Sequence, residues 1–501
     1  MSRPSERGAI AGRAALSAAW VVASRLGARS IDFVTLLVLT RALTPKDFGL
    51  VAIAMTLVQI MEAIFELPIS QVLVRSEALT PPMMHTAFTM GAARGAALAL
   101  ILGAAAWPFA RLYNDDRLIP LIMFLSLAPA MRGIASPAMA HFWRNLNFRP
   151  DAIIEISAKI LAGVIAAGLG LFTHSYWAIA SATVLGPMFM AMGSYMFAPS
   201  AVRLSLVEWR AFAGFMGWTT AAQVLVALNW QADRLIVARF VPRAELGLFS
   251  MASDLSGLPE QALLKPIYQP TFSAFALVRN DRARLGDAYQ NTAAAVFSVG
   301  LPLMLGLGLL AHPAVQVVLG AKWMEASNYL QWMALLLIMP LLNAPVTPLA
   351  MVEGRSDIFM RINLCELVIK IPATLVGVWY MGPMGVIIAR TVSAAIMVLV
   401  SMGFVRMLAG VPILRQLKRP SRPLIAGTAM AGALVLLRAY LLPLSGVALT
   451  AGLAACSLAG LLIYVAVLAG LWLASGRPPG FESWLLERAS GILARRTAKA
   501  A

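Results

Sequence analysis

The chain has 501 residues, of which 60% are hydrophobic and only 13% are charged, and its formal net charge is +17. Soluble globular proteins carry about 25% charged residues, so this composition excludes an ordinary soluble domain. A strongly basic chain can indicate nucleic-acid binding, but here the positions of the Lys and Arg residues argue against that function.

Apolar runs recur along almost the whole chain. About 20 apolar residues span the hydrocarbon core of a bilayer, and on that measure we expect an all-α polytopic membrane protein with about 14 transmembrane helices. The weakest predicted span, 247–270, carries charges and prolines, so it is either a broken helix that lines a wet cavity or not a span. The predicted spans are 14–40, 48–68, 84–108, 118–140, 152–172, 176–197, 213–238, 247–270, 289–311, 327–351, 361–381, 384–407, 424–442 and 447–473.

Lys and Arg residues are unevenly distributed between alternate connections. When the N-terminus is placed in the cytoplasm, the inside segments hold about three times as many Lys and Arg residues as the outside ones, as the positive-inside rule requires. We therefore expect a multi-pass protein of a bacterial inner membrane, with both termini cytoplasmic and no nucleic-acid partner. The first apolar stretch continues through Arg25, Arg29 and Asp32 with no clear cleavage site, which favours a retained span over a signal peptide.

An internal repeat divides the chain, and it includes charges within the apolar segments. We expect an N-lobe at 1–200, a C-lobe at 201–408, and two accessory spans with a cytoplasmic amphipathic tail at 409–501. Each lobe would hold six helices, and the two pseudo-symmetric lobes would flank a central cavity, as in transporters built from parallel repeats. The repeat pairs Arg41 with Arg239, Asp47 with Glu245, Gly49 with Gly247, Glu155 with Glu366, and Lys159 with Lys370.

The first span carries a polar stripe. Arg25, Arg29 and Asp32 lie on one side of a helix, and charges at this depth are expected to face the bundle interior or a wet cavity. Two arginines one turn apart can clamp a phosphate or diphosphate. The alternative is that Asp32 neutralises Arg29 and that the group only ties helices together.

Further charges lie within the spans. Arg94, Arg132 and Arg390 join Arg25 and Arg29 as candidate substrate-binding residues, although a structural ion pair is the main alternative for each. Glu62 and Glu66 are one turn apart in the second span. With Asp32 they are candidates for ion coupling, because burial raises the pKa of a carboxyl group. They could instead pair with the arginines of the first span.

Two pairs place Glu four residues before Lys. Glu155 with Lys159, and Glu366 with Lys370, have the order that favours a salt bridge along one helix. We expect these to be structural ion pairs that hold helices together, because both copies of the repeat contain one.

The sequence offers little support for covalent chemistry. It has no phosphate-binding GxxxxGK[ST] loop and no HExxH motif, and its four histidines are scattered. We therefore expect a protein that is not an enzyme and that uses no cofactor or metal.

Several segments together resemble a known family, over nearly the whole chain. The chain is similar to the polysaccharide-flippase branch of the multidrug/oligosaccharidyl-lipid/polysaccharide exporter superfamily, which includes the O-antigen and exopolysaccharide repeat-unit flippases. It looks most similar to the colanic-acid and succinoglycan exporter type. The segments that carry the resemblance are RALTPKDFGLVAIA (41–54), RNLNFRPDAIIE (144–155), DRLIVARFVPRAELGLFSMA (233–252), LGAKWMEAS (319–327) and VEGRSD (352–357).

This resemblance implies two six-helix lobes that form a V around a cationic cavity. It implies a substrate carried on undecaprenyl diphosphate and flipped to the outer leaflet by alternating access, for assembly of exopolysaccharide or O-antigen. The implied partners are the lipid-linked glycan, the bilayer, and a polymerase and chain-length regulator of the same pathway. The alternatives are a lipid II flippase, a cation-coupled drug antiporter of the same superfamily, and a membrane glycan polymerase or ligase.

Overall fold

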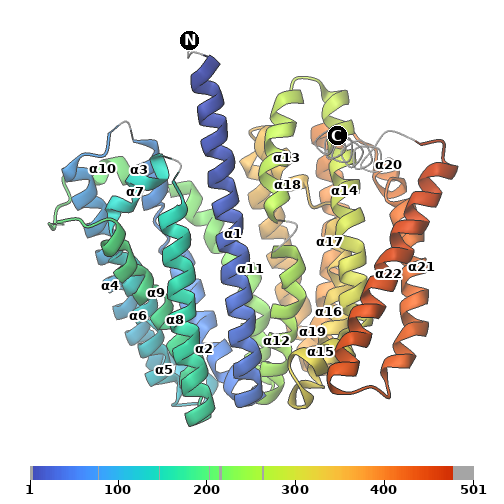
Figure 1. Cartoon of the computed structure of the whole chain (residues 1–501), viewed down its shortest axis with the longest axis horizontal. Helices are drawn as coiled ribbons and strands as arrows, with labels where there is room; N and C mark the ends of the chain where they lie inside the picture. The colour runs from blue at the N-terminus through green and yellow to red at the C-terminus, as the bar shows by residue number, and fades with distance from the viewer. Residues whose placement is uncertain are drawn as a thin grey trace, which may run out of the picture. The chain divides into compact units, whose positions relative to one another are not determined.

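The structure is a computed structural model, and it describes residues 4–76, 78–145, 147–201, 203–213, 217–261 and 265–477. Every regular element within these ranges is a helix (Figure 1). The chain packs into two compact units, Met1–Gly247 and Leu248–Ala501, here named the N-terminal and the C-terminal unit. The predicted division at residues 200 and 408 stays a prediction, and the predicted amphipathic tail lies outside the described residues from 478 onward.

In the N-terminal unit, α8 packs along both α1 and α9, α4 packs against α6, and α2 packs against α11. The helices of this unit are α1 (Pro4–Ala42), α2 (Pro45–Ile64), α3 (Ile69–Arg75), α4 (Pro81–Tyr113), α5 (Leu118–Leu125), α6 (Leu127–Gly133), η1 (Pro137–Met139), α7 (Ala140–Arg144), α8 (Arg149–Thr173), α9 (Trp177–Phe197), α10 (Trp209–Ala213) and α11 (Gly217–Phe240), and α12 (Arg243–Pro259) begins at its end.

Local sequence explains where several of these helices begin and end. At the start of α2, the Asp47 carboxylate accepts hydrogen bonds from the N–H and the hydroxyl of Thr44, and Pro45 occupies the first turn, where its missing N–H costs nothing. Thr80 caps α4 through a hydrogen bond from the Met83 N–H. At the other end of α4, Asn114 takes the left-handed conformation that ends many helices.

Glycines allow two backbone-to-backbone crossings in the N-terminal unit. A Cβ on Gly133 of α6 would lie 2.2 Å from the carbonyl oxygen of Gly91 on α4, so neither position can carry a side chain. Similarly, a Cβ on Gly49 would lie 2.0 Å from the carbonyl oxygen of Arg243, where the start of α2 meets the start of α12. These contacts place α6 and the start of α12 closer to their neighbours than ordinary helix packing allows.

A polar cluster fastens the end of α4 to the corner between α11 and α12. The Arg243 guanidinium donates to the carbonyl oxygens of Tyr113 and Ala238, and it lies over the Tyr113 ring. Asp115 accepts two hydrogen bonds from Arg117, at 2.9 and 2.8 Å, and lies 3.6 Å from Arg243. Tyr113 in turn donates its hydroxyl to the Leu235 carbonyl oxygen at 3.0 Å.

In the C-terminal unit, α21 and α22 pack side by side (Figure 1), and both contact α14. The Tyr464 hydroxyl of α22 donates to the Ser298 carbonyl oxygen of α14 at 2.9 Å. The helices of this unit are α13 (Lys265–Val278), α14 (Arg282–Leu309), α15 (Ala311–Val318), η3 (Ala321–Trp323), α16 (Ala326–Leu336), α17 (Ile338–Leu341), α18 (Val346–Val352), α19 (Ser356–Ala409), α20 (Ile413–Lys418), α21 (Ser421–Leu437), η4 (Arg438–Leu441) and α22 (Gly446–Ala474).

The long element α19 is a helical hairpin rather than one rod. Gly382 has non-helical backbone angles, and Pro383 follows it. A Cβ on Gly377 would lie 2.3 Å from the carbonyl oxygen of Gly385, which eight residues of straight helix would hold about 12 Å away. The two halves therefore fold back on each other, and the break falls between the predicted spans 361–381 and 384–407.

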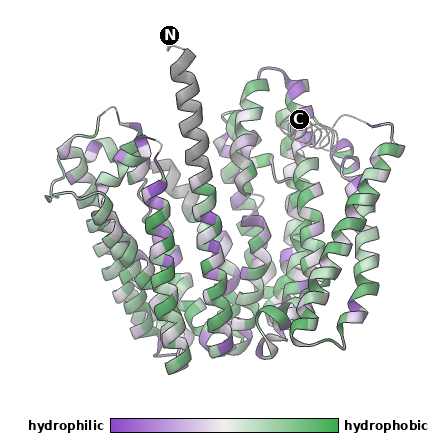
Figure 2. Ribbon diagram, in the orientation of Figure 1, coloured by the Kyte–Doolittle hydropathy of each residue, from purple (hydrophilic) through white to green (hydrophobic). Residues whose placement is uncertain are grey.

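Long apolar helices dominate both units (Figure 2). Among the described residues, 9 stretches are long and apolar enough to cross a membrane, and the bent pair Leu118–Gly133 and Pro137–Arg144 makes a tenth. Large apolar side chains such as Leu100, Phe172 and Val447 point outward from these helices, where lipid would cover them. Within the predicted span 247–270, α12 ends at Pro259, residues 260 and 261 continue as π-helix, and α13 begins at Lys265, with residues 262–264 outside the described part of the chain.

Candidate functional site

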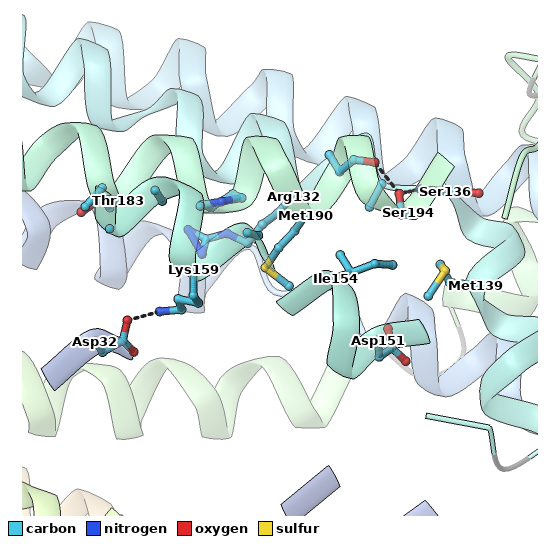
Figure 3. A pocket seen from close by; sticks show the side chains of 18 of the residues that line it. Asp32, Arg132, Ser136, Met139, Asp151, Ile154, Lys159, Thr183, Met190 and Ser194 are labelled. Carbon is cyan, nitrogen blue, oxygen red and sulfur yellow. Dashed lines mark hydrogen bonds and ion pairs between the residues drawn. The ribbon is translucent and has the colours of Figure 1, made fainter. Parts of the chain in front are cut away.

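A cavity of about 680 Å³ lies within the N-terminal unit (Figure 3). Its walls come from α1, α6, η1, α7, α8 and α9, and most of the lining is apolar. Small residues of α8 and α9, among them Ala158, Gly163 and Gly186, line the cavity and leave its space unfilled. Pockets of 300–1,000 Å³ enclose drug-sized ligands, so this cavity has the volume of a binding site.

One end of the cavity carries an ion pair between two helices. Lys159 of α8 donates to the Asp32 carboxylate of α1 across 2.6 Å, and both side chains remain partly exposed (Figure 3). The helices approach closely here because Gly163 faces Thr35 without a side chain of its own. The predicted pairing of Lys159 with Glu155 is therefore replaced by a bond to the neighbouring helix, and Glu155 is half-buried on α8.

Arg132 reaches the same cavity from the last turn of α6. Its guanidinium lies 2.7 Å from the Glu62 carboxylate of α2, and 46% of the Arg132 side chain is exposed. The backbone contact between Gly91 and Gly133 holds this end of α6 against α4. Arg132 was predicted either to bind substrate or to form a structural ion pair. In the structure it forms an ion pair and also lines a cavity.

Arg94 hydrogen-bonds to backbone carbonyl groups at the end of α2. Its Nε donates to the Phe65 carbonyl oxygen at 2.5 Å, and its second terminal nitrogen donates to the Glu62 carbonyl oxygen at 3.2 Å. These carbonyl groups lie at the break between α2 and α3, where the helix no longer supplies partners for them. Arg94 therefore caps a broken span, and it does not line the cavity. Glu66, in the break itself, is exposed.

The opposite end of the cavity is built from Asp151, Met139 and Ile154 (Figure 3). The Trp143 indole N–H donates to the Asp151 carboxylate. Neither Asp151 nor Trp143 is among the candidate site residues predicted from the sequence. Asp151 could have been noticed in the sequence, because it lies in the first turn of a helix that enters an apolar span. Carboxylates are common at the start of helices, however, so this position alone does not indicate a site.

The remaining predicted site residues lie elsewhere. Arg25 and Arg29 are exposed on α1 and do not line this cavity. In the C-terminal unit, Glu366 and Arg390 are half-buried on α19, and Lys370 is buried with 7% of its surface exposed. Arg29, Glu366, Lys370 and Arg390 each interact with neighbouring groups. The structure thus brings Asp32, Lys159 and Arg132 together on the cavity wall. Glu62 and Arg94 do not line the cavity.

Solved structures share this fold. The lipid II flippase MurJ in an inward closed conformation superposes with a TM-score of 0.70 at 16% identity, covering 92% of this chain and 100% of that one. An inward-facing multidrug resistance MATE family transporter of the MOP superfamily superposes with a TM-score of 0.55 at 14% identity, covering 77% of this chain and 95% of that one.

Curated relatives are similar in sequence. The succinoglycan biosynthesis transport protein ExoT of Rhizobium meliloti is 27% identical over 318 residues, which cover 63% of this chain and 64% of the relative, just under two thirds of its length. The lipopolysaccharide biosynthesis protein WzxC of Escherichia coli is 23% identical over 365 residues, covering 71% of this chain and 73% of the relative.

A family model described as polysaccharide biosynthesis protein matches residues 38–328. That match covers more than half of the chain and contains every helix that lines the cavity beyond α1. It agrees with the apolar helices and with the resemblance found in the sequence. The chain therefore belongs to this family of membrane-embedded polysaccharide biosynthesis proteins.

Proposed function

We propose that the chain is a flippase that moves an undecaprenyl-diphosphate-linked oligosaccharide repeat unit from the inner to the outer leaflet of a bacterial inner membrane. It works by alternating access, for assembly of exopolysaccharide or O-antigen. The observation that carries this proposal is the family match over residues 38–328, together with relatives named for succinoglycan transport and lipopolysaccharide biosynthesis.

The physical problem of such a protein is to carry sugars and a diphosphate past hydrocarbon. Polar groups in lipid cost several kcal/mol each when they lack partners, so the glycan needs a protein path lined with hydrogen-bonding groups. The cavity of the N-terminal unit offers such groups in Asp32, Lys159 and Arg132. The polyprenyl tail needs no such path and stays in lipid.

The finer architecture is part of the same proposal. It has fourteen spans, arranged as two six-helix lobes around a central cavity with two accessory helices, and both termini are cytoplasmic. The internal repeat supports the two lobes, and the distribution of Lys and Arg residues supports the orientation. A polymerase and a chain-length regulator of the same pathway would be its protein partners.

We also propose that the chain performs no covalent chemistry and needs no cofactor. In the N-terminal unit, several charged groups within long helices bond to one another or to backbone carbonyl groups. Arg132 bonds Glu62, Lys159 bonds Asp32, and Arg94 caps α2. Such pairs hold helices and bind polar ligands, which is the task of a transporter.

A second candidate is a cation-coupled drug antiporter or a lipid II flippase of the same superfamily. The carboxylates of Asp32 and Glu62 within apolar helices favour ion coupling. Each of these carboxylates already faces a cation, however, which disfavours a site built for cationic drugs.

Reconstituted vesicles test the function directly. The purified protein is inserted into vesicles that contain undecaprenyl diphosphate bearing a fluorescent oligosaccharide, and dithionite then bleaches the fluorophore on the outer leaflet. We expect the protein to make the inner-leaflet pool accessible, whereas protein-free vesicles keep that pool. Fluorescent lipid II and ethidium, each with an imposed ion gradient, serve as comparison substrates. Movement of either one without movement of the oligosaccharide lipid would contradict the proposal.

A further inference from the structure

We propose that the cavity of the N-terminal unit is a saccharide subsite, which takes neutral sugar rings and not the diphosphate. This inference rests on the proposed function, because it assigns one part of a lipid-linked oligosaccharide to one cavity. The resemblance found in the sequence implied a cationic central cavity between two lobes, with Arg132 among the candidate substrate-binding residues. The contacts of the charged side chains around the cavity lead to the different assignment.

The charges of the cavity wall are balanced. Among the described residues that line it, the charged ones are Asp32, Asp151, Arg132 and Lys159, two of each sign. Lys159 is bonded to Asp32, and Arg132 is bonded to Glu62 behind the wall. A diphosphate drawn to either cation would also lie beside the carboxylate paired with that cation, so repulsion between like charges and the desolvation of its own charge would oppose its binding.

A neutral hydroxyl group fits this wall without breaking either pair. Hydroxyl groups both donate and accept hydrogen bonds, so sugar hydroxyls can donate to Asp32 while they accept from Lys159. Lys159 carries three N–H donors and Arg132 carries five, and the ion pairs occupy only part of them. Both side chains keep a substantial exposed fraction, 36% and 46%.

The remaining wall suits the C–H faces of sugar rings. Met139, Ile154 and Met190 supply apolar surface along the cavity (Figure 3). Ser136 and Ser194 are already bonded within the protein, since Ser136 donates to the Ala198 carbonyl oxygen and Ser194 to that of Ala191. The ligand-binding polar groups are thus concentrated at the end with the ion pair, and the lining of the rest is mostly apolar.

Protection of a cysteine in the cavity tests this assignment. Cys365 is exposed and is first replaced by serine, while Cys456 is buried and can stay. Met190→Cys then places a thiol in the cavity wall, and Met196→Cys on the same helix α9 is the matched control outside it. Maleimide labelling is followed with a panel of neutral tetrasaccharides built from glucose, galactose, mannose or N-acetylglucosamine, and with farnesyl diphosphate.

We expect at least one tetrasaccharide to slow labelling of Met190→Cys by about tenfold when it is present at about ten times its Kd. Labelling of Met196→Cys should be unchanged, and farnesyl diphosphate should protect neither thiol. Protection of Met190→Cys by farnesyl diphosphate would overturn the assignment. It would also be overturned if no sugar protects the thiol in a preparation that flips the fluorescent oligosaccharide lipid.

A second variant fills the cavity. No heavy atom lies within 4 Å of a Cβ built on Gly186, so Gly186→Phe directs a ring into the open space. Gly168→Phe on α8 is the control, because that position is equally open and lies outside the cavity. We expect only Gly186→Phe to abolish sugar protection and flipping, and retention of both would count against the subsite. A wild-type protein that binds sugar but flips nothing would contradict the proposed function and leave the subsite standing.

Discussion

Gly49 and Gly247 occupy equivalent places in the internal repeat, and they pack against each other backbone to backbone. A Cβ on Gly49 would meet the carbonyl oxygen of Arg243, and a Cβ on Gly247 would lie 1.9 Å from that of Pro45. Pro45 and Arg243 are also separated by the spacing of the repeat. The contact is therefore reciprocal, like a twofold interface between two identical subunits.

Because the contact is reciprocal, Gly49→Ala and Gly247→Ala should be equally harmful. Each added methyl group overlaps a backbone oxygen that cannot rotate away, and overpacking of this kind costs about 1–3 kcal/mol. Gly103→Ala on α4 is the matched control, since no heavy atom lies within 4 Å of its Cβ position. Thermal unfolding in detergent should show a lower Tm for both variants and no loss for the control. A normal Tm for either variant would refute the close crossing.

Arg94 should prove structural and not substrate-binding. Arg94→Ala removes two hydrogen bonds from a charged donor to the end of α2, and we expect a loss of about 2 kcal/mol in the free energy of unfolding. Arg25→Ala removes an exposed side chain and should leave the Tm unchanged. Flipping should be measured per folded molecule in each case. If Arg94→Ala unfolds normally but flips poorly, the binding role predicted from the sequence is the better description.

The Asp32–Lys159 bond can be tested by exchanging its charges. Lys159→Asp alone places two carboxylates together, and Asp32→Lys alone places two ammonium groups together. The double variant Asp32→Lys/Lys159→Asp restores opposite charges, and we expect a coupling energy of about 0.5–3 kcal/mol between the two changes. Unfolding of all four proteins in detergent supplies the measurement. Additive effects would show that α1 and α8 are not joined here.

Asp115 should contribute to stability in a pH-dependent way. Hydrogen bonds from Arg117 hold the pKa of the Asp115 carboxyl below its ordinary value, with a further contribution from Arg243. Because the folded-state pKa is lowered, this stabilisation is fully present above the unfolded value of about 3.9 and is lost as the pH falls through the folded-state pKa. Asp115→Asn should therefore lower the Tm at neutral pH, and its difference from the wild type should shrink in acid. A difference that stays constant with pH would contradict this.

The sequence predicted correctly that the protein is all-helical with many long apolar helices, because the hydropathy of a membrane helix is a local property, while the number of 14 spans stays a prediction. The break between 361–381 and 384–407 falls where Gly382 leaves the helical conformation. The charges and prolines of 247–270 indicated either a broken span or no span, and this alternative stays a prediction because residues 262–264 lie outside the described part of the chain. The interruption between α2 and α3, at residues 65–68, was not predicted.

Partners across helices were the part that the sequence could not predict. The spacing of Glu155 and Lys159 favours a local pair, but Lys159 bonds Asp32, which lies 127 positions away in the chain. The spacing of residues along one helix determines which of them share a face, but not which neighbouring helix packs against that face. For the same reason the sequence left open whether Arg132 binds substrate or forms an ion pair, and the folded N-terminal unit places Glu62 beside it.

The hairpin in α19 fixes the sidedness of its two ends. Because the backbones of Gly377 and Gly385 touch at the turn, the chain enters and leaves this element at the same membrane surface. Fusion of a compartment-sensitive reporter after Gly354 or after Gly410, the glycines that flank α19, must give the same readout. This pair of fusions shows on which side of the membrane α19 begins and ends. The sides of all later connections then follow, without a count of the helices that precede α19.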